Sequence, residues 1–142
     1  RGNRDAGIAS LAAGLKYFST AFPAGATDVF ARACLGDAEA RTEALALIDA
    51  HLATRPPYVS GVAPYVLTHV GEPARALALL QDRSTTNDGL LMGELFSPPL
   101  TEARRTPEFP EFLRRMGLAA YWDEAGPPDQ CKKDTSGDYH CE

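Results

Sequence analysis

Residues 35–57, LGDAEARTEALALIDAHLATRPP, carry the strongest helical pattern in the chain. The run is rich in Ala, Leu and Glu, which favour helix, and the spacing of Ala44 and Ile48 places both on one face. Pro56 ends the pattern, because the residue before a proline is disfavoured in the helical conformation. We therefore predict a helix over residues 38–55 with one apolar face.

A second segment, HVGEPARALALLQDRSTTND at residues 69–88, can be laid over the first. The spacing of four between Ala76 and Leu80 repeats the spacing between Ala44 and Ile48. A small residue lets two antiparallel helices approach, and the large residue four positions later fills the gap beside it. One such helical hairpin leaves an apolar face uncovered, so neighbouring hairpins are expected to stack.

The chain up to residue 126 is predicted to be helical almost throughout, in short segments separated by Gly and Pro. Besides the helix above, the expected segments are 5–22, 27–36, 60–71, 72–83, 85–96, 98–105, 106–117 and 118–126. Nothing has the pattern of a βαβ unit or of an internal sheet. We predict an all-α fold of stacked antiparallel helical hairpins over residues 1–126, followed by a small C-terminal β-hairpin tail over residues 127–142.

Large apolar side chains, four of them aromatic, are concentrated in one segment, EFPEFLRRMGLAAYW at residues 108–122. This segment has two interpretations, a hydrophobic binding strip or a pair of capping helices that closes the exposed end of the array. Stacked repeats need such caps, and the capping interpretation is therefore preferred.

The two overlaid segments resemble the tetratricopeptide repeat family, over roughly residues 20–90. Residues 97–131 also resemble the C-terminal end of bacterial tetratricopeptide proteins. In those proteins the array follows an N-terminal signalling module, such as a winged-helix or nucleotide-cyclase domain. The resemblance implies an α-solenoid that acts as a non-enzymatic protein–protein interaction or scaffolding module, here the C-terminal fragment of a larger bacterial signalling or regulatory protein.

The resemblance also implies a concave groove lined by the first helix of each repeat. The residues at these positions, besides Cys34 and Gly61, are Phe30, Tyr58, Tyr65, Thr68 and His69. The Lys/Asn clamp that some family members use for a C-terminal carboxylate is absent here. The expected partner is a protein or peptide of unknown identity, and self-association is a further option.

The net charge of −5 argues against nucleic acid as a partner, which needs a clustered excess of Lys and Arg. The basic residues occur in the short pairs Arg104-Arg105, Arg114-Arg115 and Lys132-Lys133, which acidic neighbours dilute. These pairs are predicted to lie on a solvated surface. No apolar run approaches the ~18 residues of a spanning helix, so no membrane insertion is expected.

No catalytic constellation is recognisable in the sequence. His51 and His69 lack an HxxxH or HExxH context, so packing or capping of a helix end is the preferred interpretation for both. The polar stretch at residues 82–88, DRSTTND, has no glycine-rich cradle and no GxSxG turn, so it is interpreted as a linker with a helix cap. We expect no enzymatic activity, no cofactor and no metal.

The tail at residues 129–142, DQCKKDTSGDYHCE, has the pattern of a β-hairpin. Residues 134–137 suit a type I turn in which Gly137 takes the left-handed conformation. Pairing across this turn sets Lys133 opposite Tyr139, Lys132 opposite His140 and Cys131 opposite Cys141. The two cysteines are then ~4–5.5 Å apart at Cβ, which a cross-strand disulfide can bridge.

Three states of this cysteine pair are considered, with a disulfide preferred, a reduced buried pair second and a metal site third. A structural zinc takes four ligands, whereas two thiols and His140 are on offer, and His140 points to the opposite face of its strand. The alternative function is a small metal- or redox-active protein that uses Cys131, His140 and Cys141. Cys34 is expected to be a small core residue.

A disulfide implies an oxidising compartment. We therefore prefer an extracytoplasmic location, on the periplasmic side of a membrane-tethered parent, over a cytoplasmic one. The chain begins in mid-pattern at RGNRDAGIASL without Met, which leads us to expect a fragment of a longer or processed protein.

Overall fold

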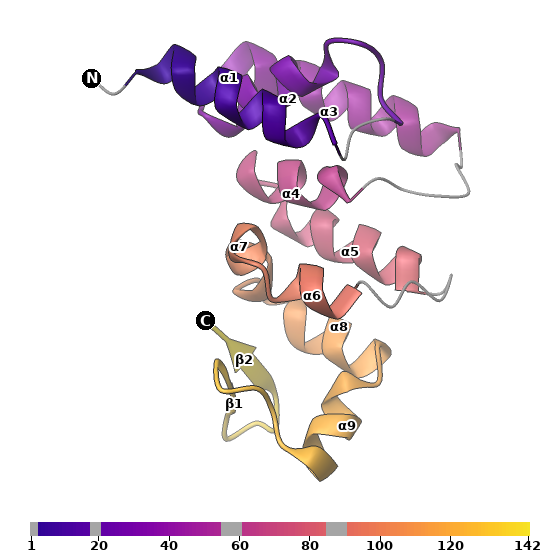
Figure 1. Ribbon diagram of the computed structural model, residues 1–142. Coiled ribbons are helices and arrows are strands. Elements are labelled where there is room, and N and C mark those ends of the chain that lie inside the picture. Colours follow the sequence, from indigo (N-terminus) through magenta and orange to yellow (C-terminus); the bar gives the residue numbers. More distant parts are fainter. Residues whose placement is uncertain (1–2, 18–20, 55–60, 85–90) are drawn as a thin grey trace. The chain divides into compact units, whose positions relative to one another are not determined.

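The computed structural model describes residues 3–17, 21–54, 61–84 and 91–142 (Figure 1). The chain divides into two compact units, Arg1–Gly71 and Glu72–Glu142. Helices make up most of the described residues, and one small antiparallel sheet lies near the C-terminus. The all-α prediction with a C-terminal hairpin is therefore confirmed, while stacking of the tetratricopeptide type and the division after residue 126 stay predictions.

The first unit contains four helices within its described residues. They are α1 (Arg4–Leu15), α2 (Ala26–Cys34), α3 (Ala38–Ala53) and α4 (Val62–His69). Helix α2 lies at the centre of this unit, since it packs against α1, α3 and α4. Ile8, Leu11 and Leu15 recur at helical spacing and form an apolar stripe along α1, and all three are intermediate in exposure. Phe18, the last residue of that stripe, lies outside the described residues.

Helix α3 begins where the sequence predicts. The Asp37 side chain accepts a hydrogen bond from the backbone N–H of Ala40 at 3.0 Å, which caps the first turn. Ala44 and Ile48 are completely buried, as their spacing predicts. The helix extends to Ala53.

Aromatic rings fill the core of the first unit beside α3. Phe30 is fully buried, and the ring of Phe22 meets it edge-on with 4.9 Å between centroids. Phe22 also faces the ring of His51 at 4.8 Å. His51 is half-buried and packs against Phe22. This agrees with the packing role that is preferred for it from the sequence.

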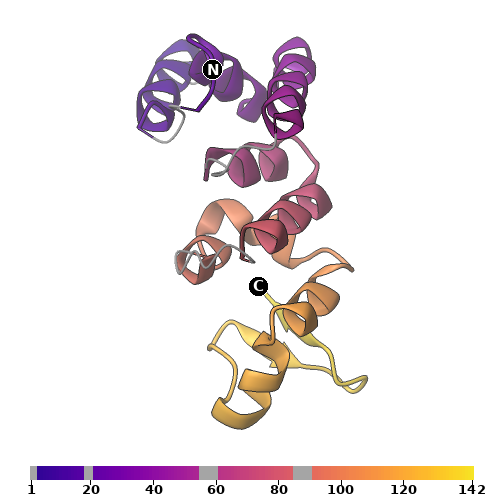
Figure 2. The same ribbon diagram turned by 90° about the vertical axis from the view of Figure 1, so that its right-hand side faces the viewer.

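The second unit combines short helices with the hairpin. Its elements are α5 (Pro73–Ser84), α6 (Leu91–Leu95), the 3-10 helix η1 (Pro98–Leu100), α7 (Thr101–Arg104), α8 (Phe109–Arg115), α9 (Leu118–Ala125), β1 (Cys131–Lys133) and β2 (Tyr139–Cys141). Helix α5 packs against α7 and α8, and α8 packs against α9 and β2. Figure 2 shows the hairpin beside α8 and α9.

The core of the second unit follows the repeated pattern. Ala76 and Leu80 are completely buried, like their counterparts in α3. Most of the large apolar residues of the aromatic segment are also buried, namely Phe109, Phe112, Leu113 and Trp122. These side chains belong to the core of the second unit, whereas Tyr121 is 63% exposed, and the capping of a stacked array stays a prediction.

The hairpin has the register that the sequence predicts. The Cα partners are Cys131 with Cys141, Lys132 with His140 and Lys133 with Tyr139. Gly137 has φ 93°, a left-handed conformation that glycine adopts without a steric penalty. The backbone N–H of Asp134 donates to the carbonyl of Asp138 at 2.8 Å and closes the turn.

Candidate functional site

Helix α4 exposes an aromatic pair on an otherwise buried element. Six of its eight residues are buried, and the side chains that reach solvent are those of Tyr65, half-exposed, and His69, exposed. These residues are four positions apart and therefore neighbours on the helix surface. His69 Nδ1 lies 2.8 Å from the carbonyl oxygen of Tyr65. Because a carbonyl only accepts, Nδ1 carries the proton and Nε2 of the neutral ring is left as an acceptor.

Two side chains donate hydrogen bonds to the backbone within α4 and at its C-terminal end. Thr68 Oγ1 donates to the carbonyl of Pro64 at 2.9 Å, which satisfies a buried hydroxyl. Arg41 Nε, from α3, donates to the carbonyl of Val70 at 2.7 Å, one residue after the helix. Arg41 thus ties the C-terminal end of α4, which carries His69, to α3.

The predicted groove residues do not all reach the surface. Phe30 and Thr68 are buried, so their side chains take part in packing and are not presented to a ligand. Tyr58 lies outside the described residues. Cys34 is half-buried, and burial raises the pKa of its thiol to about 11, which keeps it protonated at neutral pH. Among the described members of the set, His69 is exposed, and Tyr65 and Cys34 are intermediate in exposure.

Arg104 corrects the sequence prediction of a solvated Arg104-Arg105 pair. Arg105 is exposed, but Arg104 is only 5% exposed and points into the second unit. Its Nη1 donates to the carbonyls of Leu95 at 2.8 Å and Ser97 at 3.1 Å, at the end of α6. The guanidinium thus caps the α6 terminus, a role that charge counting along the sequence could not reveal.

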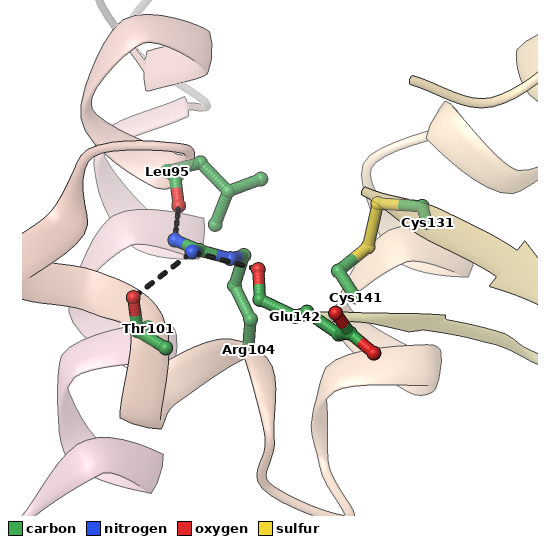
Figure 3. Close-up of a disulfide and its surroundings, with 6 residues drawn as sticks. All are labelled: Leu95, Thr101, Arg104, Cys131, Cys141 and Glu142. Carbon is green, nitrogen blue, oxygen red and sulfur yellow. Dashed lines mark hydrogen bonds between the residues drawn. A yellow bond between two sulfur atoms is a disulfide. The ribbon is translucent and has the colours of Figure 1, made fainter. Parts of the chain in front are cut away.

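The other terminal nitrogen of Arg104 reaches the end of the hairpin (Figure 3). Nη2 donates to Thr101 Oγ1 at 3.1 Å and to the main-chain oxygen of Glu142 at 3.0 Å. Nε is buried without a hydrogen-bond partner. Burial, followed by the nearby charge of Arg105, lowers the pKa of this guanidinium. The buried guanidinium is therefore bonded to three main-chain oxygens and one hydroxyl.

Cys131 and Cys141 form a disulfide across the open end of the hairpin, with 4.1 Å between their Cα atoms. This confirms the preferred state of the pair. Both cysteines are buried, and the backbone N–H of Glu142 donates to the carbonyl of Gln130 at 3.0 Å just beyond them. The disulfide thus fixes the strand end that contacts Arg104.

A separate set of contacts holds the turn end of the hairpin. The Tyr139 ring packs edge-on against Trp122 with 5.2 Å between centroids, and its hydroxyl donates to Asp123 Oδ1 at 2.7 Å. Lys133 also pairs with Asp123, and these two hydrogen bonds hold the pKa of the carboxyl below its usual value. Arg114 of α8 pairs with Asp138.

His140 lies on the exposed face of β2, whereas Cys131 and Cys141 are buried. Its Nε2 is 2.9 Å from Asp134 Oδ2. Within the part of the chain that the structure describes, no three His, Cys, Asp or Glu residues are grouped to hold a metal. The alternative metal or redox function would use the sulfur atoms of Cys131 and Cys141, and these two atoms are bonded to each other in the disulfide.

Comparisons with protein-family models, curated proteins and solved structures give no match to this chain. The tetratricopeptide resemblance therefore stays a prediction that rests on the residues quoted above. Across the described ranges, no helix combines the length and the apolar character needed to cross a membrane.

Proposed function

We propose that this chain is a non-enzymatic interaction or scaffolding module that binds a protein or peptide through Tyr65 and His69. One observation carries the proposal: on a helix whose other residues are all buried, the two that reach solvent are a tyrosine and a histidine. Surface positions without a binding role are more often occupied by Lys or Glu. An aromatic pair on a fixed backbone is typical of a recognition surface.

The chemistry of the pair fits a peptide. A tyrosine supplies a large amphipathic contact area and loses little conformational entropy on binding, because it has only two χ angles. His69 Nε2 can accept a hydrogen bond from a peptide N–H or hydroxyl, since Nδ1 is engaged with the Tyr65 carbonyl. The site would thus combine an apolar contact with one directional polar contact.

The proposed context is the C-terminal part of a larger bacterial signalling or regulatory protein of tetratricopeptide type. The buried pairs Ala44/Ile48 and Ala76/Leu80 support this context, because they occupy the close-packing positions of the overlaid segments. The Cys131–Cys141 disulfide supports an oxidising, extracytoplasmic compartment.

A displayed library of random linear peptides, selected against the whole chain, tests the proposal. Selected peptides are expected to lose at least about tenfold in affinity for Tyr65→Ala and for His69→Ala, measured by calorimetry. Tyr121→Ala is the matched control, because Tyr121 is an exposed tyrosine on the other unit. Binders with equal affinity for all three variants, or a selection that yields no binder, would count against the proposal.

A further inference from the structure

The imidazole of His69 is oriented by the last turn of α4. Its Nδ1 lies 2.8 Å from the carbonyl oxygen of Tyr65, one turn earlier in the same helix. The carbonyl accepts the Nδ1 proton, which leaves Nε2 of the neutral ring as an acceptor. In a histidine, the hydrogen bond made by one ring nitrogen decides which nitrogen carries the proton. The acceptor character of Nε2 therefore depends on the Tyr65 carbonyl staying within reach of the ring.

The last turn of α4 lies at the end of a short helix. The helix has eight residues, Val62–His69, and helices of this length are marginal on their own. The backbone N–H of Val70 donates to the carbonyl of Val66 at 2.9 Å and closes the turn. The chain then leaves the helical path at Gly71, whose φ of 84° is left-handed. Fraying of this one turn would separate the His69 ring from the carbonyl that orients it.

Arg41 opposes this fraying from a neighbouring helix. Its Nε donates to the carbonyl of Val70 at 2.7 Å, directly after the last residue of α4. The last carbonyls of a helix have no partner inside the helix, and a cation beside them interacts favourably with the helix dipole. Helix α3, which carries Arg41, is 16 residues long and is anchored by the buried side chains of Ala44 and Ile48. The donor therefore comes from a longer and better anchored element than the helix it supports.

We propose that Arg41 is a positioning residue for the Tyr65/His69 surface and that it determines the hydrogen-bond polarity of His69. With Arg41 in place, the last turn stays closed, Nδ1 keeps the proton and Nε2 accepts. The group that the surface selects is therefore a hydrogen-bond donor of the ligand, such as a peptide N–H or a hydroxyl. The ligand part of this inference rests on the proposed function, whereas the protonation of the two ring nitrogens does not.

Removal of Arg41 reverses this polarity. Once the last turn frays, the Tyr65 carbonyl no longer selects the proton position, and the tautomer with a proton on Nε2 becomes populated. That tautomer presents a donor to the donor group of the ligand. Two donors cannot bond to each other, so the directional contact is lost while the apolar contact with the Tyr65 ring remains.

Nitrogen-15 NMR of the whole chain tests the polarity without any ligand. Long-range proton–nitrogen spectra at pH 8, where histidine is neutral, show which ring nitrogen carries the proton. The unmodified chain is expected to carry it on Nδ1. Arg41→Ala should shift the population toward protonated Nε2 and should speed amide exchange of Val70 about tenfold, as loss of one charge-assisted hydrogen bond allows. Arg41→Lys keeps a cationic donor at this position and should retain the Nδ1 proton.

Arg32→Ala is the matched control in the same unit. The guanidinium of Arg32 pairs with Asp28 on its own helix and lies 3.9 Å from a carboxylate oxygen of Glu43. Its loss should leave the ring nitrogens of His69 unchanged. A change of tautomer in both alanine variants would show a general disturbance of the unit and would rule out a positioning role for Arg41.

A double-mutant cycle with the selected peptides tests the effect on binding. Arg41→Ala is expected to weaken affinity about fivefold in the unmodified chain, because the orientation of one hydrogen-bonding group is lost. The same change should have no further effect in the His69→Ala background. It should still weaken binding in the Tyr65→Ala background, since the His69 contact is present there.

The proposal is wrong if the unmodified chain carries the proton on Nε2, a result that requires no variant and is unaffected by misfolding. It is also wrong if Arg41→Ala leaves the tautomer unchanged, or if its loss of affinity persists in the His69→Ala background. A selection that yields no binder counts against the proposed function alone, because the nitrogen spectra still decide the role of Arg41.

Discussion

A single carboxylate, Asp37, fixes where the longest described helix begins. The hydrogen bond from the Ala40 N–H, helped by the charge of Arg32, lowers the pKa of this carboxyl. A lowered folded-state pKa means that Asp37 stabilises the fold above the unfolded pKa of about 3.9, and that this contribution disappears as the pH falls through the folded value. Asp37→Ala should therefore lower Tm at neutral pH, and the difference from the unmodified chain should shrink below about pH 4.

Asp37→Asn separates the cap from the charge. Asparagine keeps the side-chain oxygen that accepts the Ala40 N–H but cannot ionise, so its effect on Tm should be smaller than that of alanine and nearly independent of pH. Thermal melts of the three proteins at pH 7, 5 and 3 provide the measurement. An alanine effect that stays constant down to pH 3 would contradict the role given to the carboxylate.

At the scale of elements, the hairpin and α9 depend on one another through two aromatic rings. Trp122 is the single tryptophan of the chain, and its ring is covered partly by Tyr139. Tyr139→Ala should therefore expose Trp122 to water and shift its fluorescence emission to longer wavelength. Tyr139→Phe keeps the ring and removes only the hydroxyl bonded to Asp123, so its emission should match that of the unmodified chain. Equal spectra for Ala and Phe would show that the ring contact does not shield Trp122.

Elements whose structure follows from neighbouring residues were predictable from the sequence, and contacts between distant residues were not. The start of α3, the buried Ala44/Ile48 spacing and the whole hairpin register follow from capping, periodicity and a turn with a left-handed glycine. The buried position of Arg104 depends on hydrogen bonds to Leu95, to Ser97 and to Glu142, which is 38 positions away. Packing between helices likewise decides that Phe30 and Thr68 are buried, which the sequence pattern of the expected groove did not indicate.

At the scale of the whole molecule, the chain consists of two compact units that differ in how they are stabilised. The disulfide lies entirely in the unit Glu72–Glu142, and the unit Arg1–Gly71 contains one cysteine, Cys34, which is free. Units of about 70 residues bury limited cores, so a covalent link counts for a large share of the stability of such a unit. The two units should therefore respond differently to reductant.

Calorimetric unfolding of the whole chain with and without reductant tests this difference. A cross-link between residues 10 positions apart contributes about 2.5 kcal/mol in the chain-entropy model, which corresponds to a Tm change of about 10 °C or more in a unit of this size. We expect reductant to lower the Tm of the transition of unit Glu72–Glu142 by this amount and to leave the Tm of the transition of unit Arg1–Gly71 unchanged. Cys131→Ser/Cys141→Ser should reproduce the shift without reductant, and Cys34→Ala is the control that removes the remaining thiol and keeps the disulfide. A single transition that moves as a whole would mean that the two units unfold as one cooperative body, in which the hairpin disulfide stabilises residues as distant as α1.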